Sequence, residues 1–192
     1  MGHLVMSEYL INNNQSPIEE LKKSLLAMNK AKELKPGDNY NYFLIAKAYY
    51  LEAKWLILQN KSAEKALNDC YKAIEEGLKI NPKNTNINAL LASTFSLEVE
   101  SLIKQNSKNV DEFIEKGLKA SEQALSANLN NADAYVSKAE LYLLSASIQA
   151  DKSKAKELAI KAQESLQKAL SLNKLLEKEK EALANKINKA LS

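Results

Sequence analysis

Few side chains in this 192-residue chain could do chemistry, and they are not grouped as an active site requires. The only histidine, His3, lies in residues 1–5, which look like an added leader, so we expect no catalytic or metal-binding role for it. Cys70 is the only cysteine, and no histidine is positioned to activate it, so we expect a buried structural thiol rather than a nucleophile. Adjacent carboxylates such as Glu19–Glu20 and Glu75–Glu76 are expected on solvated helix faces.

Motifs for metals and phosphates are also missing from the sequence. It has no Cys/His cluster with zinc spacing and no oxygen-rich loop of the calcium type. It has no Gly-rich phosphate loop and no protein-kinase catalytic motif. The charged segment 152–161 mixes lysines with acids, as solvated helices do. We therefore expect no catalysis, no metal and no cofactor in this chain.

The charge composition of the chain indicates which classes of partner to expect. All 27 basic residues are lysines, 24 acidic residues are spread among them, and the net charge is +3. Arginine makes the bidentate contacts to phosphates and guanines, so its absence argues against nucleic-acid binding. No stretch approaches the roughly 20 apolar residues of a membrane span. The lone cysteine is typical of a reducing compartment, so we expect a cytoplasmic protein that does not bind membranes.

Evenly spaced alanines indicate the elements that organise the chain. Ala46, Ala92, Ala139 and Ala184 follow one another at intervals of 46, 47 and 45 residues, each in a similar local pattern. Such a period is typical of helical repeat arrays, in which each repeat is stabilised by its neighbours. Small residues at these positions let two antiparallel helices approach closely.

Apolar periodicity and turn residues predict two helices of about 20 residues in each repeat. Ser16 and Ser62 are predicted helix caps, and Pro17 suits a first helical position. The predicted helices are about 17–34, 40–59, 63–80, 85–104, 111–127, 132–150 and 153–172, with a last one from about 175 to the end. The repeats are then about 17–62, 63–109, 110–152 and 153–192. Residues 9–16 mirror 55–62, so we interpret the chain as opening at the tail of a repeat and as a fragment of a longer protein.

The junctions 77–84 and 124–135 resemble those of tetratricopeptide repeats. The family's large–small–aromatic pattern fits Tyr42, Ala46 and Tyr49, and again Tyr135, Ala139 and Tyr142; its small residue in the second helix corresponds to Ala31, Gly77, Ala124 and Ala169. The usual period of about 34 residues is exceeded here by about 12. Lengthened repeats of this kind resemble the region C-terminal to bacterial serine/threonine protein kinase domains.

This resemblance implies an all-α fold: a right-handed α-solenoid of antiparallel helix pairs, with about seven long helices and a short N-terminal remnant. It implies one repeat domain over 6–192. It also implies a concave surface lined by the first helix of each repeat. By position, this places a candidate partner-binding groove at Tyr40, Phe43, Lys47, Tyr50, Asn86, Ser93, Asp133 and Glu140.

Two functions remain open at this point. The favoured one is a non-catalytic protein-interaction or scaffolding domain of a bacterial signalling protein, with a protein or peptide anchored by the aromatic part of the groove. The alternative is a small-molecule receptor, which would need a sizeable apolar pocket. Phe43 and Tyr50 could instead pack on the preceding repeat. The family's clamp for C-terminal carboxylates is not matched, because Asn88 and Lys138 do not stand at the clamp positions. The oligomeric state stays open.

Overall fold

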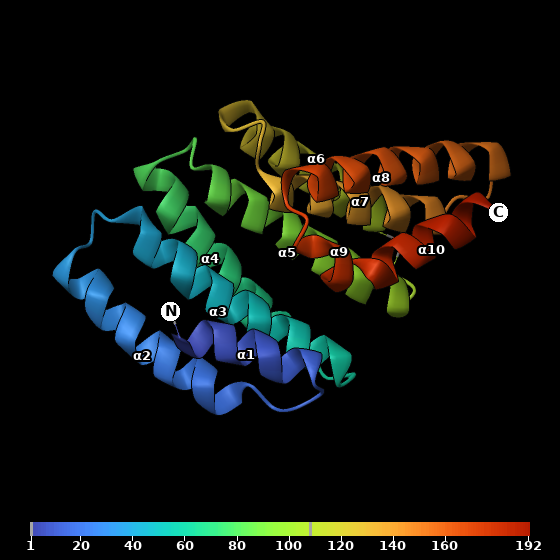
Figure 1. Ribbon diagram of the computed structural model, residues 1–192. Coiled ribbons are helices and arrows are strands. Elements are labelled where there is room, and N and C mark those ends of the chain that lie inside the picture. The colour runs from blue at the N-terminus through green and yellow to red at the C-terminus, as the bar shows by residue number, and fades with distance from the viewer. Residues whose placement is uncertain (1, 108) are drawn as a thin grey trace. The chain divides into compact units, whose positions relative to one another are not determined.

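The computed structural model describes residues 2–107 and 109–192, and within them the chain is all-α, as predicted (Figure 1). No strand occurs in this described part. The helices are α1 (Gly2–Asn12), α2 (Ile18–Leu34), α3 (Asn39–Leu58), α4 (Glu64–Ile80), α5 (Thr85–Lys104), α6 (Val110–Ala127), α7 (Ala132–Ser147), α8 (Lys152–Leu172), α9 (Leu176–Glu179) and α10 (Glu181–Leu191). The long helices, α2 to α8, each have 16 to 21 residues.

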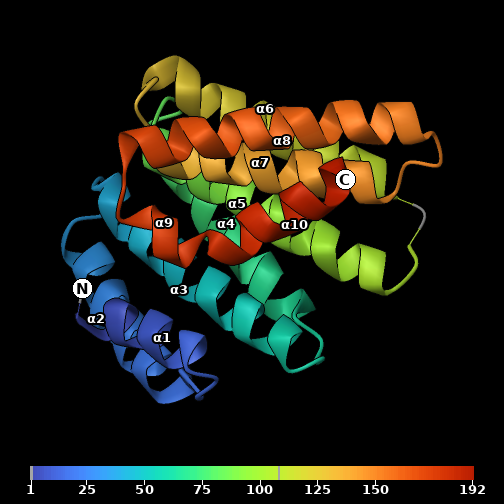
Figure 2. The same ribbon diagram turned by 45° about the vertical axis from the view of Figure 1, so that its right-hand side comes forward.

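The helices fall into two compact units that divide within α5. The first ends at Leu90 and the second begins at Leu91. In the first unit, α2 and α4 both pack against α3, and α1 contacts α2 and α3. In the second, α7 packs against α8, and α10 contacts both of them, as Figure 2 shows.

The ends of three helices repeat at a spacing of 46 residues. Asn14, Asn60 and Asn106 follow α1, α3 and α5, and each has a φ of 54°, in the left-handed region. Asparagine tolerates this region better than most residues. In each copy the next residue donates its N–H to a carbonyl five positions earlier, which is one of the bonds of a Schellman motif: Gln15 to Leu10 (2.7 Å), Lys61 to Leu56 (2.8 Å) and Ser107 to Leu102 (3.0 Å). The end of α1 at Asn14 thus has the same geometry as the end of α3 at Asn60, in line with the sequence similarity between residues 9–16 and 55–62.

The second helices of the repeats also end alike. The residue after each helix donates its N–H to the carbonyl of the predicted small residue: Lys35 to Ala31 (3.0 Å), Asn81 to Gly77 (3.1 Å), Asn128 to Ala124 (3.0 Å) and Asn173 to Ala169 (3.0 Å). Three residues further on, Asp38, Asn84 and Asn131 accept N–H groups from the first turn of the next helix. Such side-chain caps satisfy backbone donors that the helix itself leaves unpaired.

Close packing at small residues holds the first unit together. Ala46 of α3 is fully buried, and its carbonyl accepts a hydrogen bond from the Cys70 thiol of α4 at 3.3 Å. Cys70 is itself fully buried, as predicted for a structural thiol. A Cβ on Gly77 would lie 3.1 Å from the Cβ of Tyr42, so α3 and α4 could not keep this approach with a larger residue.

The second unit has the same construction principle around α7. Ala139 and Ala162 are fully buried in a cluster with Leu166 and Ile187. Leu141, also fully buried, packs against Val99 and Val110, among others. The predicted small positions Ala92, Ala124 and Ala169 are fully buried as well, whereas Ala184 is half-buried.

The helix ends differ from the sequence prediction in three places. Pro17 precedes α2 and Ala63 precedes α4, so neither Ser16 nor Ser62 stands at the capping position, and neither helix start has a side-chain cap bond. The helix predicted from about 175 to the end is broken at Lys180 into α9 and α10. Apart from these differences, residues 2–5 of the expected leader 1–5 form the first part of α1, and Leu4 is buried, whereas residue 1 lies outside the described residues.

Candidate functional site

The aromatic part of the predicted groove lies at the start of α3. Asp38 caps this helix by accepting the N–H of Tyr40 at 3.0 Å. The rings of Tyr40 and Phe43 are stacked one helical turn apart, with centroids 5.9 Å apart and an interplanar angle of 25°. Tyr40 is 40% exposed and Phe43 is half-buried. The stack therefore forms a partly exposed aromatic surface at the start of α3.

The next predicted groove residue on α3 is engaged by α1. Lys47 Nζ lies 2.8 Å from Glu8 Oε1, and both side chains are partly exposed. Tyr50, one turn further, is half-buried. Helix α1 thus reaches the face of α3 that carries Lys47. A ligand that used the Lys47 ammonium would have to compete with Glu8.

The predicted groove residues on α5 lie on both sides of the unit boundary. Asn86 belongs to the first unit and is exposed. Ser93 belongs to the second unit, where its hydroxyl lies 2.7 Å from the hydroxyl of Ser137 on α7. The structure therefore places Ser93 in a contact between two first helices of neighbouring repeats.

The two acidic residues of the predicted groove lie on α7. Asp133 is exposed, and Glu140 accepts a hydrogen bond from Ser96 of α5 at 3.1 Å. Burial lowers the pKa of Lys180, but the carboxylates of Glu140 and Glu179 outweigh burial, and that pKa is raised. Asp133 adds to the same effect. Both groove carboxylates therefore already stabilise a partly buried cation within the second unit.

A pocket that the sequence did not indicate lies in the first unit, between α2 and α4 and over α3. Its volume is about 170 Å³. Its polar lining includes Asn29 and Lys32 from α2, Tyr42 and Tyr49 from α3, and Asp69, Lys72 and Glu76 from α4. The pocket is smaller than the roughly 300–1,000 Å³ that encloses a drug-sized ligand. In the sequence, Tyr42 and Tyr49 belong to the large–small–aromatic pattern, and only their spacing of seven residues, two turns on one helix face, indicates a shared surface.

Carboxylates shape the electrostatics around Tyr49. Burial raises the pKa of Tyr49, and the charges of Asp69 and Glu52 raise it further. Burial likewise raises the pKa of Glu52, with Asp69 adding to the shift and Lys65 opposing it. Both shifts have the sign expected where desolvation and negative charge disfavour an added negative charge. Besides burial, the carboxylates of Asp69 and Glu52 therefore both act on the Tyr49 phenol.

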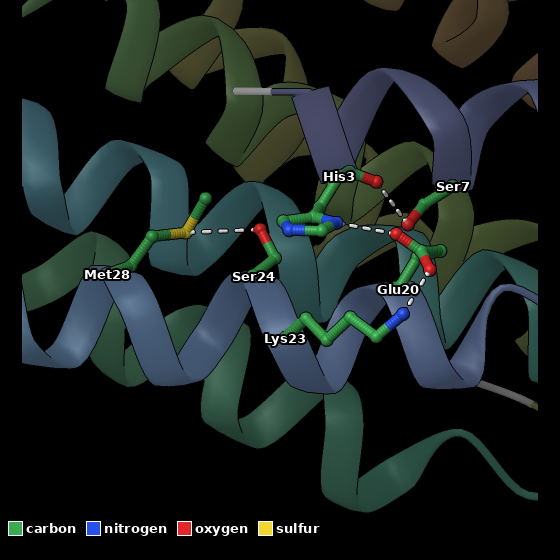
Figure 3. Close-up of polar contacts among 6 residues, drawn as sticks. All are labelled: His3, Ser7, Glu20, Lys23, Ser24 and Met28. Carbon is green, nitrogen blue, oxygen red and sulfur yellow. Dashed lines mark hydrogen bonds and ion pairs between the residues drawn. The ribbon is translucent and has the colours of Figure 1, made fainter.

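The single histidine takes part in the contact between α1 and α2. His3 Nδ1 lies 2.5 Å from Glu20 Oε2, and Lys23 Nζ lies 2.8 Å from the other oxygen of Glu20. Figure 3 shows both side chains directed at this carboxylate. The hydrogen bond from Lys23, followed by that from His3, lowers the pKa of Glu20. Ser7 donates a hydrogen bond to the backbone carbonyl of His3 within α1. The pair His3–Glu20 therefore connects α1 to α2.

The remaining residues considered for chemistry lie on helix surfaces. Glu19 pairs with Lys22, and Glu75 pairs with Lys79, within their own helices. Within residues 2–107 and 109–192, no group of three or more histidine, cysteine or carboxylate side chains is arranged to hold a metal ion.

Two further findings concern context. None of the helices within the described residues combines the length and the apolar character that crossing a membrane requires. Comparisons with models of protein families, with curated proteins and with solved structures found no match.

Proposed function

We propose that this chain is a non-catalytic protein-interaction or scaffolding domain. The observation that carries the proposal is the stacked pair Tyr40–Phe43, which presents a partly exposed aromatic surface at a capped helix start. Aromatic side chains fixed in this way are frequent energetic anchors of protein interfaces. They lose little conformational entropy on binding because the fold already orders them.

The architecture supports the same proposal. Repeating helix ends 46 residues apart are typical of arrays in which stacked helix pairs form extended binding surfaces. We propose that the array is a right-handed, tetratricopeptide-like solenoid with a protein or peptide as its ligand. We further propose that it belongs to a cytoplasmic bacterial signalling protein of the serine/threonine kinase type, on the resemblance of its lengthened repeats.

A peptide-selection experiment tests this function. The immobilised chain is used to select from a displayed random peptide library, and the affinities of enriched peptides are measured by fluorescence polarisation. We expect saturable binding that is weakened about ten-fold or more in the double variant Tyr40→Ala, Phe43→Ala, as for the loss of hot-spot residues.

The matched control replaces two apolar side chains that are well exposed in the second unit, Leu129→Ala and Leu175→Ala. This control variant is expected to bind like the wild type. Equal affinities of both double variants would contradict the aromatic site. A library from which no peptide binds saturably would contradict the proposed function itself.

A further inference from the structure

The pocket between α2 and α4 has the dimensions of a site for one side chain. At about 170 Å³ it is too small to enclose a whole drug-sized ligand, but it opens to solvent between two helices. Three helices supply its walls, and Tyr42 and Tyr49 line it from α3. Around the axis of α3, these tyrosines point about half a turn away from the pair Tyr40–Phe43. The pocket and the predicted groove therefore use different faces of α3.

One acidic side chain of the pocket, Asp69, is only weakly paired with a cation. The Asp69 side chain is only 26% exposed, and its charge acts on the Tyr49 phenol. Lys72 Nζ lies 3.8 Å from Asp69 Oδ1, and that lysine is 76% exposed at its side chain. A long, solvated pair of this kind contributes little free energy. The Asp69 carboxylate can therefore exchange Lys72 for an incoming cation at small cost.

The other end of the pocket shows how a cation fits. Lys32 Nζ lies 5.4 Å from the ring centroid of Tyr42 and 3.6 Å from Glu76 Oε2. A cation over a tyrosine ring and beside a carboxylate is favoured by both groups. Tyr49 and Asp69, two turns along α3 and α4 from these residues, repeat the combination of a ring and a carboxylate within the same pocket.

We propose that this pocket binds a basic side chain, lysine or arginine, of a protein partner, with the charged group held by Asp69 and the ring of Tyr49. The proposal rests on the proposed function, because it names the chemistry of the partner. The small volume favours a single side chain of a larger ligand. The Asp69 carboxylate, which lines the pocket together with Tyr49 and forms a long ion pair with Lys72, favours a cation over an anion.

Small probes test the pocket without a natural partner. Nα-acetyl-lysine methylamide, and in parallel its norleucine and glutamate counterparts, are titrated into the ¹⁵N-labelled chain and followed by two-dimensional NMR. We expect saturable shifts from the lysine probe at backbone amides of residues 42–49 and 69–76. The norleucine probe, which lacks the charge, and the glutamate probe should give no saturable shifts there.

Two variants locate the cation. Asp69→Asn and Tyr49→Leu should each weaken binding of the lysine probe about five-fold or more, while Glu75→Gln, on an exposed part of the same helix, should leave it unchanged. Thermal melts confirm that the variants are folded. Lysine-induced shifts that are spread over exposed carboxylates, or that persist in both variants, would overturn the proposal. Its failure alongside a selected peptide that depends on Tyr40 and Phe43 would leave the proposed function standing.

Discussion

A Cβ atom on Gly117 would lie 2.8 Å from Cδ1 of Leu141, closer than non-bonded carbon atoms approach in proteins. The same Cβ would lie 3.0 Å from the Cβ of Phe95. Leu141 is fully buried, so relief of this contact requires its side chain to repack within the core. Gly117→Ala is therefore expected to lower the free energy of unfolding by about 1–3 kcal/mol, the usual cost of overpacking, as measured by urea denaturation.

Gly37 provides the matched control for this glycine prediction. No atom lies within 4 Å of a Cβ added there, and its φ is not positive. Gly37→Ala should leave the stability unchanged or raise it by up to about 1 kcal/mol, because alanine restricts the unfolded chain. Equal stabilities of Gly117→Ala and the wild type would contradict the close packing of α6 in the second unit.

The repeated alanine is the second target. Ala92 of α5 is fully buried, and we expect Ala92→Leu to destabilise the protein by about 1–3 kcal/mol because the helices around it must separate. Ala27→Leu, at an exposed position of α2, is the control and should change the stability by less than about 0.5 kcal/mol. A thermal melt of Ala92→Leu that matched the wild type would refute the packing register derived from the alanine spacing.

Local signals explain why so much of the fold could be predicted from the sequence. The period of the alanines and the turn residues at 35–38, 81–84 and 128–131 fix the helix pairs, because they act within a few residues. The prediction that Ser16 and Ser62 cap helices is wrong, because one further residue, Pro17 or Ala63, stands between each serine and the first helical residue. The break at Lys180 was missed because no proline or glycine marks it.

The candidate sites depend on tertiary contacts that no local pattern encodes. The pair Lys47–Glu8 forms only because α1 folds back onto α3, and Glu140 meets Ser96 across two helices. The pocket near Tyr49 requires α2, α3 and α4 to be placed together. Tyr42 and Tyr49 stand out in the sequence as members of the large–small–aromatic pattern, but no local pattern links them to the carboxylate of Asp69 on α4.

The left-handed residue at the end of α3 gives a third prediction. Asn60 has a φ of 54°, where alanine is less tolerated than asparagine and glycine is unstrained. Asn60→Ala should lower the free energy of unfolding by about 1 kcal/mol, whereas Asn60→Gly should preserve or raise it. Asn68→Ala, on an exposed helical position of α4, is expected to be neutral or slightly stabilising. Stability equal to the wild type in Asn60→Ala would contradict the repeated helix end.

A fourth prediction concerns pH and Glu52. Burial raises the pKa of this carboxyl in the folded protein, and Asp69 adds to the shift. The folded state therefore holds more protons than the unfolded state between the two pKa values, so the contribution of Glu52 to stability falls as the pH rises through that window. Below both pKa values the residue is protonated in either state, and the effect disappears.

Glu52→Gln removes this cost because glutamine is neutral at every pH. We expect the variant to be more stable than the wild type at pH 7, by a margin that shrinks as the pH falls toward the unfolded pKa of glutamate, about 4.3. Urea denaturation at several pH values measures the margin. Glu33→Gln, at an exposed position of α2, controls for the loss of one surface charge. A margin that grew as the pH fell would reverse the sign and show that the cations Lys65 and Lys22 outweigh burial at this carboxylate.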